Sequence, residues 1–288
     1  MKRWFAAVSV MLVIGVSQSW AVEPQYTKAG AGLSSYKILV GPKLNPIIQG
    51  ARYDLGRGIS VALAKINLQQ SSVTLHPGSQ VPGNLKLWGA TNYISSTASS
   101  KVVAAFNSGF KLKDSRGGFY ENGHTAGRIA VGVASFIIYK DGHVKIKPWP
   151  KGGVITPDVA SIRQNIAPLI VGGVISKNIN NNLFYDWGGT VSSVYTVWRS
   201  GVAVDGLGNL IYAAGNNLTP LDLVTALKAA GGVDAMELDI NGGWVDFYYY
   251  TQKAGRGGLA AHKLTNFWSP TGRYLKGWSR DFFTISSK

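Results

Sequence analysis

The chain has 288 residues, 45% of them hydrophobic and 15% charged, a balance typical of a globular protein and unlike that of a disordered one. It contains 36 glycines, 13 tyrosines and 9 tryptophans, which favours a β-rich fold over a helical one. It contains no cysteine, so disulfides and thiolate metal sites are excluded. We predict an α+β protein, a β-rich single domain with mixed sheets and a few helices.

Residues 1–21 have the pattern of a secretory signal peptide. Lys2 and Arg3 precede an apolar run from Phe5 to Val16, and Ser19-Trp20-Ala21 forms a small-x-small cleavage site. The alternative is a membrane anchor, for which the apolar run is short. We therefore expect an exported protein, periplasmic or at the cell surface. Its mature chain would be residues 22–288, with no integral membrane segment.

The net charge is strongly basic, at +15 for the whole chain and +13 once Lys2 and Arg3 are removed with the leader. Outside the cytoplasm, nucleic acid is not the expected partner of such a surface. Anionic cell-wall polymers, lipopolysaccharide or sugar phosphodiesters are the partners that its charge favours. A basic surface that serves only solubility is the alternative.

The first half of the chain reads mainly as strands. We expect strands at Tyr36–Val40, from Arg52, over Ile59–Leu68 and up to Gly78, then a short helix over Ile94–Lys101 and a strand over Val102–Phe106. Farther on, Ala134–Ile146 is a predicted hairpin around Asp141-Gly142.

The second half reads as a hairpin, a helix and a strand. The hairpin spans Val202–Ala213 around Asp205-Gly206. The helix has Thr219 as its N-cap, Pro220 in its first turn and Gly231 as its stop.

The stretch that follows, Met236–Trp244, carries the most informative pattern. Because side chains alternate along a strand, Glu237, Asp239 and Asn241 share one face, with Met236, Leu238 and Ile240 on the other. Two carboxylates and an amide that lead into Gly242-Gly243 are costly to bury unless they line a site. A solvated polar face is the alternative interpretation.

Several segments resemble the phosphodiester glycosidase family, whose best-known member is the lysosomal uncovering enzyme. They are Arg199–Ala203 with Asp205-Gly206, the helix from Leu218 to Gly232, Leu238-Asp239 with Gly242-Gly243, Val103–Phe110, and Asn165–Gly173. They cover roughly residues 100–285. The chain departs from the family by inserting Ile240-Asn241 and by placing Trp244 where a glycine or serine is usual, which alters the pocket floor.

The resemblance implies roles for individual residues. Asp239 would be the general acid or base, and Glu237 either the second carboxyl group or a residue that tunes Asp239. Arg199 and Asn107 would hold the anionic group. Gly109, Asn241, Gly242, Gly243 and Trp244 would contact the substrate. An Arg199 exposed at a cleft would argue for phosphate, and one buried against a carboxylate would argue against it.

The loop Gly117–Arg128 is glycine-rich and reads as the rim of an active site, or alternatively as a solvated hairpin tip. Glu121 and His124 on it are candidates for substrate binding and proton transfer. The four histidines lack the spacing of a zinc site, and we predict no metal and no cofactor, with a calcium ion on Asp and Asn oxygens left open.

The function we expect is that of an exported hydrolase that cleaves a sugar-1-phosphodiester or a related glycosidic linkage in envelope or extracellular glycans. Two alternatives stay open. One is a glycan-binding module without catalysis, and the other is a polysaccharide glycosidase whose substrate contains no phosphate.

Overall fold

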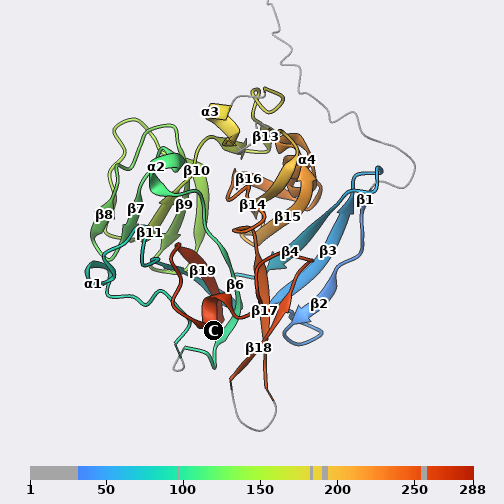
Figure 1. Ribbon diagram of the computed structural model, residues 1–288, viewed down its shortest axis with the longest axis horizontal. Coiled ribbons are helices and arrows are strands. Elements are labelled where there is room, and N and C mark those ends of the chain that lie inside the picture. Colours follow the sequence, from blue (N-terminus) through green and yellow to red (C-terminus); the bar gives the residue numbers. More distant parts are fainter. Residues whose placement is uncertain (1–31, 96–97, 182–183, 190–193, 254–257) are drawn as a thin grey trace, which may run out of the picture.

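The computed structural model describes residues 32–95, 98–181, 184–189, 194–253 and 258–288, and its strands form three sheets (Figure 1). The predicted signal peptide lies outside these residues. The β-rich single domain with a few helices is confirmed.

The largest sheet has nine strands. In spatial order they are β1 (Gly32–Leu33), β3 (Ile48–Asp54), β4 (Ser60–Ile66), β15 (Leu210–Leu218), β14 (Val197–Asp205), β16 (Gly232–Glu237), β12 (Pro168–Val171) and β13 (Val174–Ile175), with β2 (Lys37–Val40) paired to β3. The β14–β15 pair is the hairpin expected around Asp205-Gly206.

Two sheets of five strands complete the fold. One contains β10 (Val144–Pro148), β9 (Ala134–Tyr139), β11 (Val159–Gln164), β7 (Phe119–Glu121) and β8 (His124–Ala126). The other contains β18 (Leu259–Lys263), β17 (Phe247–Gln252), β6 (Val102–Asn107), β19 (Phe282–Ser287) and β5 (Ser71–His76). All strand pairs between the described residues are antiparallel, so the expected mixed sheets are antiparallel ones.

The helices are short, namely α1 (Leu85–Trp88), α2 (Leu112–Ser115), α3 (Phe184–Trp187), α4 (Pro220–Ala229) and the 3-10 turn Arg273–Leu275. The helix expected after Thr219 is α4, which begins with a capping box between Thr219 and Asp222. The helix expected over Ile94–Lys101 is wrong, because Ala98–Lys101 form turns. Among the described residues, no helix has the length and hydropathy needed to cross a membrane.

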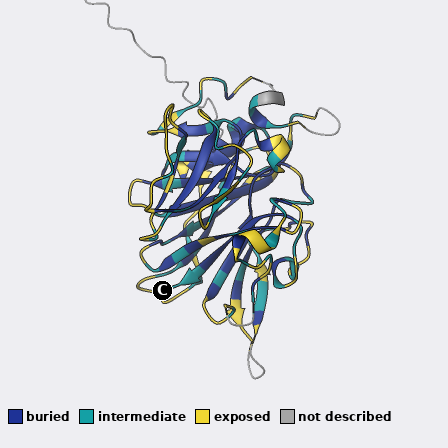
Figure 2. Cartoon of the chain, turned by 90° about the vertical axis from the view of Figure 1, so that its left-hand side faces the viewer, coloured by how far each residue is buried: buried dark blue, intermediate teal, exposed yellow. Residues whose placement is uncertain are grey.

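Of four hydrophobic clusters among the described residues, the two largest hold the sheets together. The larger joins all three sheets, with Phe106 of β6, Phe136 of β9 and Met236 of β16 in one cluster. The smaller packs Leu223 and Leu227 of α4 against the nine-stranded sheet. Figure 2 shows the buried strands enclosed by exposed loops. The end of β6, the strand β14 and the segment after β16 meet, since Asn107 donates to Ser200 Oγ and Ser200 Oγ donates to the carbonyl of Asp239.

Candidate active site

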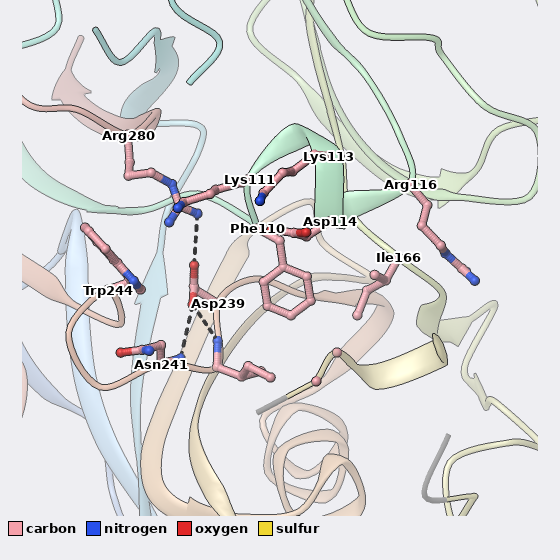
Figure 3. Close-up of a pocket in the computed structure, with 13 residues that line it drawn as sticks. Phe110, Lys111, Lys113, Asp114, Arg116, Ile166, Asp239, Asn241, Trp244 and Arg280 are labelled. Carbon is pink, nitrogen blue, oxygen red and sulfur yellow. Dashed lines mark hydrogen bonds and ion pairs between the residues drawn. The ribbon is translucent and has the colours of Figure 1, made fainter. Parts of the chain in front are cut away.

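A cavity of about 600 Å³ lies where the end of β6 and the segment after β16 come together. Its wall is formed by Phe110, Lys111, Lys113, Asp114, Arg116, Ile166, Gly188, Gly189, Asp239, Ile240, Asn241, Trp244 and Arg280 (Figure 3). Four of these residues are basic and two are acidic, so the wall carries an excess of positive charge.

Asp239 lies in this wall two residues beyond the end of β16. Its Oδ1 accepts hydrogen bonds from the backbone N–H groups of Ile240 (2.8 Å) and Asn241 (3.1 Å). Burial raises the pKa of Asp239 above its usual range, an effect that the Arg280 guanidinium and these two amides oppose. The side chain is thus a carboxyl group poised to exchange a proton at a higher pH than an exposed aspartate would.

Arg280 is the cation that faces Asp239, and sequence reasoning did not single it out. Its Nη2 lies 3.1 Å from Asp239 Oδ2 and donates to the carbonyl of Gly109 at 2.8 Å. Its guanidinium also lies 5.0 Å from the ring centroid of Trp244. The buried Nε has no hydrogen-bond partner among the described residues. Arg280 therefore brings a positive charge to the cavity wall beside Asp239.

Arg199 and Glu237 do not line the cavity. They form an ion pair in the interior, with Arg199 Nη1 2.6 Å from Glu237 Oε1 and both residues at most 1% exposed. The other Arg199 donors bond the carbonyls of Trp187, Tyr195 and Leu218. Burial raises the pKa of Glu237 to about 7, against the opposing charge of Arg199.

This ion pair corrects two expectations. An arginine buried against a carboxylate is the arrangement that argues against phosphate binding by that residue, and Arg199 has it. The shared strand face expected for Glu237 and Asp239 is wrong, because β16 ends at Glu237: Glu237 points to Arg199 on β14, and Asp239 lies past the strand end at the cavity. The pair of neighbouring catalytic carboxylates is therefore absent from the cavity wall.

Asn107 also serves the fold. Its Oδ1 accepts from Tyr212 Oη and from the N–H of Asp246, and its Nδ2 donates to Ser108 O and Ser200 Oγ. These four bonds use the whole capacity of the amide, so it has none left for a sugar or a phosphate.

The glycines are needed for close packing. A Cβ at Gly109 would lie 2.8 Å from Asn165 Cγ, and one at Gly242 would lie 2.6 Å from Trp198 Cδ1. The N–H of Gly243 donates to Asn241 Oδ1, which tightens the turn before Trp244. Of the predicted substrate-binding residues, Asn241 and Trp244 line the cavity, and Asn107 and Gly109 line a narrow recess beside it.

Glu121 and His124 lie on β7 and β8, in the sheet that contains β9, and neither lines the cavity. Glu121 accepts a hydrogen bond from Ser161 Oγ, and burial raises the pKa of its carboxyl to about 7. His124 is exposed and meets the ring of Trp88 edge-on. The loop is therefore a hairpin apart from the cavity wall.

Arg273 is a further residue that sequence reasoning missed. It bonds Asp246 Oδ2 through Nη1 and the carbonyl of Gly243 through Nη2, at 2.8 Å, and its guanidinium lies 4.3 Å from the Trp278 ring centroid. It thereby ties the turn before Trp244 to the buried Asp246.

No group of three or more potential metal ligands lies within the described part of the chain.

Comparison with known proteins relates this fold to a glycosidase. The catalytic domain of zebrafish N-acetylglucosamine-1-phosphodiester alpha-N-acetylglucosaminidase, auto-inhibited by its pro-peptide, aligns with a TM-score of 0.53 and 16% identity over 90% of this chain and 89% of that one. A hypothetical protein from Synechocystis aligns with a TM-score of 0.42 and 15% identity over 84% of this chain and 62% of that one. The sequence matches no protein-family model and no curated protein. The chain therefore shares the fold of a phosphodiester glycosidase domain at a distant level.

Proposed function

We propose that this protein is an exported hydrolase that cleaves a sugar-1-phosphodiester or a related glycosidic linkage in envelope or extracellular glycans. The observation that carries the proposal is the Asp239–Arg280 pair in the wall of a basic cavity. The distant fold relationship to a glycosidase domain supports the reaction class by analogy.

The cavity supplies a group for each part of this reaction. Asp239 would transfer the proton, because burial keeps its carboxyl protonated to a higher pH than usual. Arg280, which lines the cavity, would hold the anionic group, with the exposed Lys111 and Lys113 at the rim adding positive potential. Trp244 would offer its ring to a sugar.

Glycosidic cleavage commonly uses a second carboxyl group. Asp114 of α2 is the other carboxylate of the wall, and it takes the role in this proposal that Glu237 has in the sequence-based prediction. Asp114→Asn should then reduce turnover without unfolding the protein, because Asp114 is exposed.

The test is a screen of the mature protein against sugar-1-phosphodiesters and nitrophenyl glycosides, with Asp239→Asn as the matched inactive control. Turnover of a phosphodiester that requires Asp239 supports the proposal. Turnover confined to neutral glycosides would instead indicate a glycosidase whose substrate has no phosphate.

A glycan-binding module without catalysis is the second candidate. The observation that favours it is the ion pair between Glu237 and Arg199, which removes from the cavity the predicted second carboxyl group and a predicted anion-binding side chain. This candidate predicts that the wild type binds glycans, that binding depends on Trp244, and that none of the substrates is turned over.

A further inference from the structure

Trp268 is an exposed aromatic residue that contacts the turn Asn241–Trp244, which borders the cavity. It is 70% exposed, whereas Phe267 and Ser269 on either side are each 3% exposed. Phe267 packs against Trp198 with ring centroids 5.7 Å apart, and Ser269 Oγ is hydrogen-bonded to Tyr248 Oη. Both neighbours are anchored in the core, so the backbone holds the indole outward.

The indole of Trp268 lies over Gly242 of the cavity turn. A Cβ at Gly242 would be 2.7 Å from Trp268 Cε3 and 2.6 Å from Trp198 Cδ1. Gly242 follows Asp239 by three residues, so their Cα atoms are at most about 11 Å apart. The exposed ring therefore packs on the turn that contains Asn241 and Trp244, both of which line the cavity.

Trp198 packs on the same turn and is buried. Its Nε1 is buried and has no partner within the described residues, and the residue is 7% exposed. Nε1 is bonded to Cδ1, the atom nearest Gly242, so the polar edge of this ring faces the turn. Because Trp198 is buried, the aromatic face open to a ligand is that of Trp268, and such a face suits the C–H groups on one side of a pyranose ring.

We infer that Trp268 is an accessory sugar-binding platform, which holds a pyranose unit of a longer glycan beyond the two units that the cavity holds. The inference rests on the proposed function for its choice of a glycan, and it narrows the substrate class to oligosaccharides or longer chains. Isolated exposed apolar residues are common on protein surfaces. Trp268 differs from these because both neighbours are anchored and because it packs on the cavity turn.

Binding can be measured without turnover, by isothermal titration of the mature protein with β-linked N-acetylglucosamine oligomers of two and six units. We expect the wild type to bind the hexamer more tightly than the dimer. Trp268→Ala should weaken hexamer binding roughly tenfold, as truncation of an aromatic hot spot does, and leave dimer binding nearly unchanged. Trp268→Phe should keep most of the affinity. Leu207→Ala, which removes an 80% exposed apolar side chain in the turn between β14 and β15, is the matched control and should change nothing.

Equal hexamer affinity in Trp268→Ala and the wild type would overturn the inference, as would a wild type that binds neither oligomer. Equal weakening of both oligomers with a lowered melting temperature would indicate a structural role for Trp268 and would also overturn it. The proposed function fails separately. Trp268-dependent binding without turnover of any substrate would support the sugar-binding platform and contradict the hydrolase. Turnover without Trp268-dependent binding would support the hydrolase and contradict the platform.

Discussion

Arg280 Nη2 and Asp239 Oδ2 lie 3.1 Å apart across 41 residues of sequence. The same guanidinium nitrogen bonds the carbonyl of Gly109 at the end of β6. One arginine therefore joins the segment before β19 to the ends of β6 and β16. This contact provides the cation that the candidate site needs and that Arg199, in the interior, does not provide.

Asp239→Asn keeps the size of the side chain and removes its titratable proton. Because general acid–base catalysis typically contributes about 10²–10⁴-fold, kcat should fall by that order. Circular dichroism should show an unchanged fold. Turnover that survives the substitution would remove Asp239 from the mechanism.

Arg280→Lys keeps the charge but loses the planar guanidinium. We expect kcat/KM to fall roughly tenfold or more on a sugar phosphodiester relative to a neutral nitrophenyl glycoside, since hydrogen bonds to charged groups contribute about 1.5–3 kcal/mol. The ratio of kcat/KM on the two substrates separates two roles of Arg280. Loss of anion binding lowers only the value for the phosphodiester, whereas loss of the contact with Asp239 lowers both values alike. Equal losses on both substrates would contradict anion binding by Arg280.

Arg199→Met leaves the Glu237 carboxyl without its partner in the interior. Breaking a buried ion pair costs about 3–5 kcal/mol, so chemical denaturation should show a loss of stability of that order. The double variant Arg199→Met with Glu237→Gln should recover part of the loss, because no buried charge remains. An Arg199→Met protein that is as stable as the wild type but has an altered substrate preference would indicate that Arg199 contacts the substrate.

Glu121→Gln should change stability in a pH-dependent way. The pKa of Glu121 is raised to about 7 in the folded protein, so between about pH 4.5 and 7 the folded state binds more protons than the unfolded state. Wild-type stability should therefore decline over that range as pH rises. The melting temperature of the variant relative to that of the wild type should be higher at pH 8 than at pH 5. A difference in melting temperature between variant and wild type that is the same at both pH values would argue against the raised pKa of Glu121.

Export predicts a mature N-terminus near Val22. Mass spectrometry of protein recovered from the periplasm or medium of an expressing bacterium should show the loss of residues 1–21. An intact leader on the recovered protein would contradict cleavage at Ser19-Trp20-Ala21.

Local patterns in the sequence predicted the elements that local physics controls. The β14–β15 hairpin follows from two apolar runs around Asp205-Gly206, and α4 follows from Thr219, Pro220 and a helical apolar period. The strand that leads to Asp239 was likewise readable, because alternation and the glycines lie within a few residues of one another. Fold class followed from the same signals.

Tertiary structure alone decided which charges meet. Glu237 and Asp239 are two residues apart, yet Glu237 pairs with Arg199 inside the protein and Asp239 pairs with Arg280 at the cavity. Each partner comes from a different segment, and their meeting depends on the order of strands in two sheets. A residue type and its spacing carry no information about that order, so sequence reasoning chose the arginine next to a recognisable hairpin and missed the one before the last strand.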